Sequence, residues 1–293
     1  MAVIEIAMPT TPNFMRSEFR LHRAVGQTVS PFTGKQKTQE YDYVGWSAQV
    51  TLPPMRRAVA ANWQSWLTRL KGSSNFFQFA DPDALTNLGT YDTAYLEAVP
   101  RVSVASTTLT FATDNTILDD GTIFADAVVG DYIFITGAND AENNGTHKIS
   151  VKNHANNKVT VTSTLAAETN DSNCKVQQNV KGATGLALRA STNTAAGSIA
   201  VGDYLGVLTA ASATSVPKQL LLVTEVSTQT AVSGGKNLIS VGTEPKLRAD
   251  ITSGHFVKFT SPKGIFRLTD NVVEWGGDRN SNYNIGFSVT EVI

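Results

Sequence analysis

The fold is decided by one stretch, residues 46–79, WSAQVTLPPMRRAVAANWQSWLTRLKGSSNFFQF. Its first seven residues alternate between apolar and polar side chains, which predicts a strand with one buried face. Pro53-Pro54 then predict the start of a helix, because the first helical N–H groups need no partner inside the helix. Gly72 predicts its end, since glycine accepts the left-handed conformation that commonly follows a helix. The stretch therefore predicts a strand, a helix over about residues 54–71, and a short aromatic strand.

The predicted helix carries one apolar stripe at spacings of three and four residues, as expected for a helix that packs on other structure. Aromatic side chains also recur in the strands before and after it. A tryptophan pair such as Trp63 and Trp66 can bind carbohydrate, but at helical spacing we interpret it as core. The predicted structural core consists of Trp46, Val59, Trp63, Trp66, Leu67, Leu70, Phe77, Phe79, Phe266 and Leu268.

Composition favours strands along the whole 293-residue chain. Charged residues make up only 17% of it, and small polar and β-branched residues are plentiful. The aromatic-rich style of residues 1–85 returns in residues 259–293, and isolated terminal strands need a sheet to join. We therefore predict a mainly β protein in which these two ends form one split β-barrel or sandwich with the single helix, while small β modules are inserted between them.

Residues 86–180 and residues 181–258 are predicted to be two inserted β modules. Short β-branched runs alternate with turn signals such as Asn144-Gly145, a rhythm typical of small sandwiches and barrels. Val129-Gly130-Asp131-Tyr132 recurs as Val201-Gly202-Asp203-Tyr204, each time entering a strand. Either two related modules follow one another, or both reuse one kind of turn.

Several functional classes find no support in the residue patterns. The net charge is −1 and no basic stripe is present, so nucleic-acid binding is not expected as the main task. No apolar run reaches the ~20 residues of a membrane span, and the N-terminus does not look like a signal peptide. We expect a protein that is made in a cytoplasm, remains soluble there and does not insert into membranes.

Catalytic and metal-binding motifs are also missing from the sequence. The single cysteine, Cys174, excludes an internal disulfide, and the four histidines have no metal-site spacing. Acidic loops around Asp114, Asp119 and residues 140–145 could hold calcium, but Asp and Asn are also the usual turn residues. We therefore predict no enzymatic activity, no catalytic or metal-binding residue, and no cofactor.

Two parts of the chain resemble distal tail (Dit-like) or minor tail proteins of siphophages. These two parts together cover about two thirds of the chain. The first part runs from Val29-Ser30-Pro31-Phe32-Thr33-Gly34 through the strand, helix and aromatic strand described above. The second includes Ala200-Val201-Gly202-Asp203-Tyr204, Glu244-Pro245-Lys246-Leu247-Arg248 and Gly264-Ile265-Phe266-Arg267-Leu268. Residues 86–180 depart from that pattern and resemble an extra β module found in phage tail proteins.

The resemblance implies a structural protein of the virion tail tip, or baseplate, that is synthesised in the cytoplasm of the bacterial host. Six copies would close into a hexameric ring around the DNA channel. That ring would join the tail-tube protein to the tail-tip hub and the receptor-binding parts. A tail-tube subunit, a carbohydrate-binding adhesion module with Tyr91, Tyr95, Tyr132 and Tyr204 as stacking candidates, and a glycoside hydrolase with two carboxylates remain alternatives.

Overall fold

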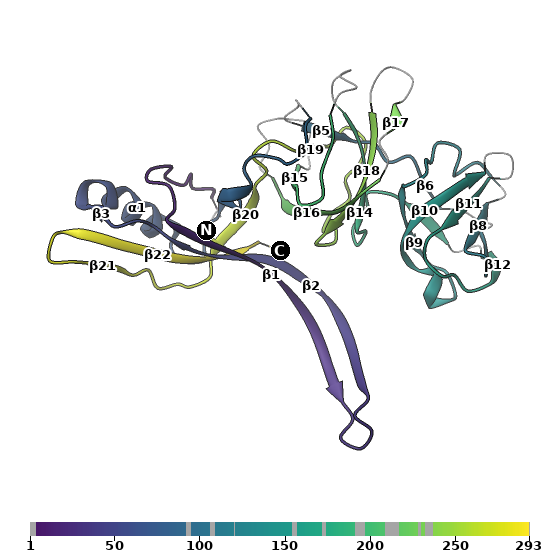
Figure 1. Cartoon of the computed structure of the whole chain (residues 1–293), viewed down its shortest axis with the longest axis horizontal. Coiled ribbons are helices and arrows are strands. Elements are labelled where there is room, and N and C mark those ends of the chain that lie inside the picture. The colour runs from purple at the N-terminus through teal and green to yellow at the C-terminus, as the bar shows by residue number, and fades with distance from the viewer. Residues whose placement is uncertain are drawn as a thin grey trace. The chain divides into compact units, whose positions relative to one another are not determined.

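The computed structural model confirms a mainly β fold, with 48% of residues in strands and 8% in helices. The chain divides into two compact units, Met1–Leu85 with Lys263–Ile293 and Thr86–Pro262, here called the split unit and the inserted unit (Figure 1). The structure describes residues 4–91, 95–105, 109–119, 121–153, 157–171, 174–190, 197–208, 217–227, 230–231 and 237–292.

The split unit is one antiparallel sheet in the order β1-β2-β22-β20-β4, with β3 and β21 paired to β22. Its first half supplies the hairpin and the helix, and its second half supplies the strand β22 between β2 and β20. The two ends of the chain therefore share one sheet. Its elements are β1 (Arg16–Val29), β2 (Gln36–Thr51), β3 (Met55–Arg56), α1 (Arg57–Leu70), β4 (Phe77–Phe79), the short 3₁₀ helix η1 (Pro82–Ala84), β20 (Gly264–Leu268), β21 (Trp275–Gly277) and β22 (Asn282–Glu291).

Helix α1 begins three residues later than the expected start. Met55–Arg56 pair with β22 as the short strand β3, so the helix begins only at Arg57. Lys71 and Gly72 both take the left-handed conformation, with φ of 54° and 63°, and end the helix as the sequence predicted. A side chain at Gly72 would also meet the backbone of Asn271 at 2.9 Å, so this position requires glycine for space as well as for conformation.

The core of the split unit is an aromatic cluster between α1 and the sheet. Trp63 and Trp66 meet edge to face at 5.6 Å between ring centroids, and Phe287 of β22 packs against both. Nine of the ten predicted core residues are buried. Val59 is the exception and was assigned wrongly: it is 36% exposed, because the buried stripe runs back from Trp63 through Ala60.

The inserted unit contains a closed six-stranded barrel and a nested module, residues 103–177, whose chain leaves the barrel after β5 and returns before β14. The barrel closes because β14 pairs with both β18 and β5. The nested module is an eight-stranded sheet with its own core. The barrel strands are β5 (Tyr95–Ala98), β14 (Gly185–Ala190), β15 (Tyr204–Leu208), β16 (Gln219–Val226), β18 (Asn237–Glu244) and β19 (Phe256–Lys258), with β17 (Thr230–Ala231) added to β18. The nested module contains β6 (Ser103–Ala105), β7 (Leu109–Ala112), β8 (Thr116–Asp119), β9 (Tyr132–Thr136), η2 (Ala141–Asn143), β10 (Gly145–Asn153), β11 (Lys158–Val161), β12 (Glu168–Asp171) and β13 (Lys175–Gln177).

Two of the expected boundaries differ from the structure. Strand β5 lies in the predicted module 86–180, yet it pairs with β14 and β19 and closes the barrel. Phe259, expected in the split unit, is buried in the barrel core, and the split unit resumes only at Lys263. Both differences arise because strand pairing joins segments far apart in sequence, which local composition does not record.

The nested module repeats the connectivity of the barrel. Six barrel strands follow the spatial order β5-β19-β15-β16-β18-β14, and six module strands follow the order β6-β13-β9-β10-β11-β8. In chain order the two sets also correspond one to one. They differ at closure, because β8 pairs with β7 instead of returning to β6. The structure therefore favours two related modules, one inserted within the other, over a turn that is merely reused.

The strand registers of the two copies agree in detail. Tyr132 lies opposite Lys148, and Tyr204 lies opposite Leu222. Lys148 and Leu222 each stand one residue before a bulge that both copies share. That bulge falls between Ile149 and Val151 in the module and between Val223 and Glu225 in the barrel. Since a one-residue slip would reverse every side chain, the agreement assigns equivalent positions across both copies.

Candidate assembly interface

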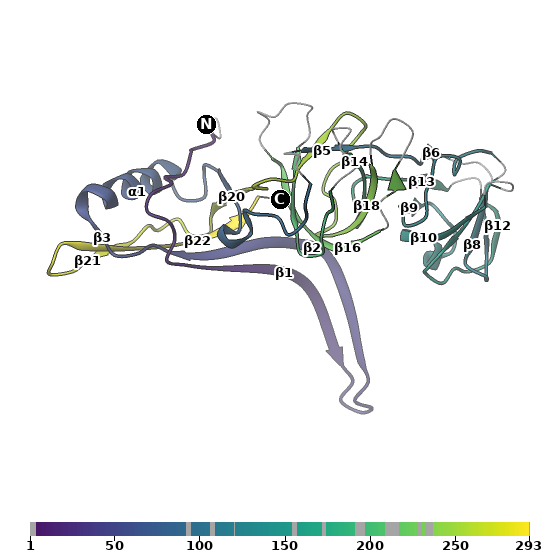
Figure 2. The ribbon, with the colours of Figure 1, turned by 45° about the horizontal axis from the view of Figure 1, so that its top comes forward.

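Strands β1 and β2 form a hairpin that continues well beyond the rest of the sheet of the split unit (Figures 1 and 2). The two strands pair from Arg16 opposite Thr51 to Val29 opposite Gln36, with one irregularity after Arg23. The inner half belongs to the sheet itself, because β2 pairs there with β22, and Trp46, Ala48 and Val50 are buried. We call the outer half, residues 24–43, the arm.

The arm exposes apolar side chains along its length. Phe32 at its tip is 95% exposed, and the large side chains of Val25, Val29, Tyr41 and Tyr43 are about half exposed. A two-stranded hairpin is at best marginally stable in water without a further strand or a packed face. Exposed apolar groups gathered on one element are typical of interaction surfaces, so the arm is a candidate interface.

The turn chemistry of the arm gives it a defined end. Gly34 takes φ of +64° and donates its N–H to the carbonyl of Ser30 at 2.9 Å, while Ser30 donates to the carbonyl of Lys35 at 2.9 Å. Farther back, the ring of Tyr41 lies over Gly26, 3.1 Å from where a Cβ would be. An aromatic ring over a strand glycine is a known way to secure strand pairing.

The two faces of the split-unit sheet differ in chemistry. One row of paired residues is apolar, with Phe19 opposite Ala48 and Ala48 opposite Val289, and this face packs under α1. The next row, on the other face, is polar. It runs Arg20, Ser47, Thr290, Arg267 across β1, β2, β22 and β20. The alternation follows directly from the two-residue period of strands.

The polar face is hollowed into an open pocket of about 640 Å³. Arg20, Arg23 and Arg267 line it together with His22, and no carboxylate of the described residues does so. Two of these arginines reach acids outside the pocket, Arg20 to Glu18 at 2.5 Å and Arg23 to Glu40 at 3.4 Å. The Nε of Arg267 is buried without a hydrogen-bond partner. This face therefore suits contact with water or with a polar partner.

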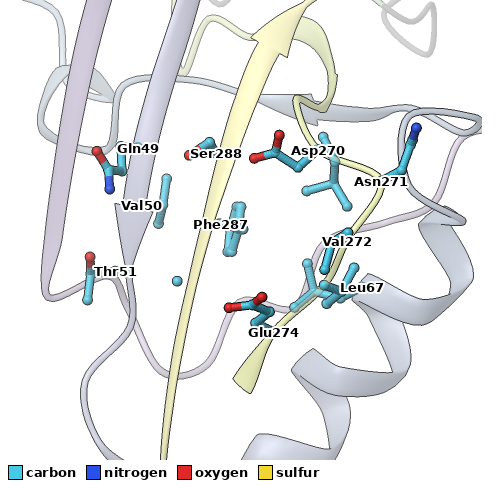
Figure 3. Close-up of a pocket in the computed structure, with 13 residues that line it drawn as sticks. Gln49, Val50, Thr51, Leu67, Asp270, Asn271, Val272, Glu274, Phe287 and Ser288 are labelled. Carbon is cyan, nitrogen blue, oxygen red and sulfur yellow. The ribbon is translucent and has the colours of Figure 1, made fainter. Parts of the chain in front are cut away.

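A second pocket, of about 540 Å³, contains a pair of carboxylates (Figure 3). Asp270 and Glu274 line it together with Leu67 of α1 and Phe287 of β22. Glycoside hydrolases hold two such carboxyl groups and desolvate one of them so that it can act as an acid. Asp270 and Glu274 are both exposed, so the pocket supplies an acidic pair without that burial.

The acidic loops use their oxygen atoms in turns. Asp140 accepts the N–H of Glu142 at 3.0 Å and caps η2, and Asn144 accepts the N–H of Ala138 at 3.0 Å. The hydroxyl of Thr116 donates to Asp114, which is the first cause of a lowered pKa of that carboxyl. Within the described ranges, no three His, Cys, Asp or Glu side chains gather in a way that could hold a metal ion. Asp120 lies outside the described residues.

The tyrosines considered for carbohydrate stacking are engaged inside the inserted unit. Tyr91 is buried in the barrel core against Phe259, and Tyr95 packs edge to face on Phe256. Tyr132 donates its hydroxyl to Glu225 at 2.6 Å, where the module meets the barrel. Tyr204 is partly buried at the equivalent barrel position. Their arrangement differs from the open aromatic platform that such binding would use.

Among the three histidines in the described residues, His147 is the buried one, and it lies in the nested module. It occupies the position equivalent to the buried Leu221 of the barrel. Its Nδ1 pairs with the Ser163 hydroxyl at 2.5 Å and its Nε2 with the carbonyl of Asn143 at 3.0 Å. Burial lowers the pKa of His147 below its ordinary value of 6.5. His22 and His255 pair with hydroxyl groups nearer the surface, and His154 lies outside the described residues.

We expect the inserted unit to lose stability as the pH falls below about 6.5. Below this pH the unfolded chain binds a proton at His147, whereas the folded chain keeps His147 neutral. The free energy of unfolding therefore falls by up to about 1.4 kcal/mol per pH unit until the pH reaches the lowered pKa of the folded state. His147→Leu, which copies the barrel residue, should remove this part of the slope in urea unfolding curves measured from pH 7.5 to 5. His22→Leu on the exposed face of β1 should keep it. An unchanged slope in His147→Leu would contradict the assignment.

No protein-family model matches this sequence, and no curated protein matches it. The arm is therefore a candidate interface on the grounds of geometry alone. Within the described chain, no helix has the length and apolar character that a bilayer span requires. Sequence reasoning included Phe32 in a resemblance but assigned it no role, and it did not identify the arm. The sequence signal for a hairpin arm was the continuous run of β-branched and polar residues on both sides of the turn Ser30-Pro31-Phe32-Thr33-Gly34.

Proposed function

We propose that this protein is a structural component of a long-tailed phage virion, and that copies of it assemble through the split unit into a ring at the distal end of the tail. The ring would link the tail tube to the tail-tip hub and the receptor-binding parts. Three features support the proposal: the resemblance carried by the residues quoted above, the sheet with one helix formed from both chain ends, and the exposed arm.

The arm is the observation that carries the proposal. An isolated chain leaves the two strands of the arm unsupported and Phe32 almost fully in water. A neighbouring copy could cover the arm with a surface different from the arm itself. Such heterologous contacts produce a closed ring when the rotation between neighbours closes. They would also remove the aggregation hazard of an exposed strand edge along β1.

The polar face of the sheet fits the same assembly. A ring around a channel needs one face that tolerates water and another that is packed, and the split-unit sheet has this division between its two rows. In our proposal the row from Arg20 to Arg267 faces the channel side, and α1 lies on the outer side. Inter-subunit pairing of strands would continue the sheet from copy to copy.

Negative-stain electron microscopy of the purified full-length protein tests this proposal. We expect closed rings with sixfold symmetry, as single or stacked pairs, at micromolar concentration. Long tubes would instead support the alternative of a tail-tube subunit. A population that remains monomeric by light scattering at concentrations up to about a hundred micromolar would contradict a self-assembling ring.

A further inference from the structure

The repeated Val-Gly-Asp-Tyr sequence forms the same turn in both copies. Asp131 and Asp203 each donate their N–H to the carbonyl three residues earlier, and Gly130 and Gly202 take φ of 92° and 96°. Each aspartate also accepts the N–H of that earlier residue on Oδ2, from Val128 at 3.0 Å and from Ala200 at 2.8 Å. Each turn therefore leaves a rigidly held carboxylate with remaining capacity for other donors.

In the barrel, the remaining capacity of Asp203 is used by the chain segment that enters the barrel. The N–H of Leu88 donates to Oδ1 at 2.6 Å, and the N–H of Gly89 donates to Oδ2 at 3.1 Å. Gly89 lies so close that a Cβ would be 2.9 Å from this carboxylate and 2.1 Å from the carbonyl of Ser198. The entering segment is thus fixed on the turn by its backbone.

In the nested module, Asp131 binds the entering segment through a side chain instead. Arg101 lies between β5 and β6, and its Nε donates to Oδ2 of Asp131 at 2.9 Å while its second nitrogen donates to Oδ1. The same guanidinium donates to the hydroxyl of Ser240 in barrel strand β18 at 2.6 Å. The side chain of Arg101 is 4% exposed and that of Asp131 is 0% exposed. This ion pair is therefore shielded from solvent between the module and the barrel.

The surrounding contacts show a close fit between the two copies. Tyr132 packs against the cross-strand glycine pair Gly185 and Gly242, where added Cβ atoms would lie 2.2 Å and 3.0 Å from the tyrosine. Glu225 of the barrel accepts hydrogen bonds from Tyr132 and from Lys148 of the module. Complementary packing of this kind holds one orientation, because neither side can shift without steric overlap or lost hydrogen bonds.

We infer that the Val-Gly-Asp-Tyr turn is a docking device that each copy uses to fix its entering segment, and that Arg101 on Asp131 holds the nested module in one orientation on the barrel. The module is then a rigid extension of the barrel and not a domain on a flexible tether. Separating the two would expose the pair or leave a buried charge without its partner, and the latter is strongly unfavourable. Rigidity follows for the isolated chain as well as for any assembly.

The module's own equivalent docking surface lacks the chemistry for a third copy. The positions of Gly185, Gly242 and Ser240 are taken there by Thr116, Thr160 and Lys158, as the shared register assigns them. The threonines add bulk where the equivalent tyrosine of a third copy would pack, and the lysine would repel its docking arginine. The series of docked copies therefore ends at the nested module, as terminal repeats usually differ from internal ones.

Distance measurements between spin labels test this inference on the full chain. Labels would be placed at Glu142→Cys in the module and Lys218→Cys in the barrel, both exposed, in a Cys174→Ala background that removes the natural cysteine. Double electron–electron resonance should give a single narrow distance peak. A broad or multiple distribution in this otherwise unchanged chain would overturn the rigid junction.

Arg101→Ala is expected to widen that distribution at least about twofold, because the buried charge of Asp131 loses its partner. Arg189→Ala is the matched control, since Arg189 pairs with the carboxylate of Glu97 inside the barrel and not with the carboxylate of Asp131. It should leave the distribution narrow. If Arg101→Ala does not fold, Arg101→Lys keeps the charge but not the two-nitrogen contact with Asp131 and should still broaden the peak. A peak as narrow as in the unchanged chain for either Arg101 variant would overturn the role assigned to Arg101.

Discussion

Trp63→Ala should destabilise the split unit by about 3–5 kcal/mol, as large aromatic truncations in packed cores do. The Trp63 side chain is completely buried, contacts Phe14, Trp66 and Phe287, and donates its indole N–H to the carbonyl of Thr11 at 3.0 Å. The substitution leaves a cavity in the aromatic cluster and an unpaired carbonyl. Urea unfolding followed by tryptophan fluorescence measures the loss, with Trp46, Trp66 and Trp275 as the remaining reporters in this unit.

Val59→Ala is the matched control for this prediction. Val59 lies on the same helix but is partly exposed, and alanine has a higher helix propensity than valine. We expect a change within about 0.5 kcal/mol, as for most surface substitutions. A Trp63→Ala protein that unfolds at the same urea concentration as the unchanged protein would refute the packing of α1 on the sheet.

Local patterns were sufficient to predict the parts of the fold that are determined by neighbours in sequence. The helix, its end at Gly72 and the aromatic strand after it follow from periodicity and turn chemistry, and they appear in the structure. The assignment of Val59 failed because a stripe at spacings of three and four has two possible continuations. The packing partner decides between Val59 and Ala60, and the sequence does not record that partner.

Non-local pairing accounts for most of what the sequence could not predict. The sequence places β5 in the predicted module of residues 86–180. Its hydrogen bonds nevertheless join it to barrel strands about 90 and 160 residues later in the chain. Phe14 packs on Trp63 in the aromatic core, although no periodic pattern in the sequence includes it. Arg101 stands in an unpatterned connection, and only the folded junction gives it Asp131 as a partner.

The duplication shows how little sequence a shared topology needs. Four residues recur, while registers, bulge and turn hydrogen bonds agree throughout. The conserved chemistry is the part that backbone geometry demands: a glycine with positive φ followed by an aspartate that accepts N–H groups. Elsewhere the copies changed side chains freely, including His147 in place of Leu221, as long as the core face remained filled.

Removing the arm should abolish assembly while leaving the fold intact. In the variant, an Asn-Gly turn would replace residues 24–43 and connect Arg23 directly to its register partner Val44, the two-residue loop that hairpins favour. Because the arm residues removed are largely exposed, we expect the free energy of unfolding of the monomer to change by less than about 1 kcal/mol. Size-exclusion chromatography with light scattering should show a shift from the ring to the monomer mass.

Phe32→Ser tests the contribution of the tip of the arm separately from that of the strands behind it. This substitution removes the most exposed large apolar side chain and keeps Gly34 and the turn hydrogen bonds. If the tip inserts into the neighbouring copy, the concentration needed for half-assembly should rise by about tenfold or more, the effect of losing one apolar anchor worth ~1.4 kcal/mol or more. Thr33→Ser, next to it, should leave that concentration unchanged. Rings that form equally well without the arm would show that copies meet through another surface, and the exposed apolar side chains would then require a different partner.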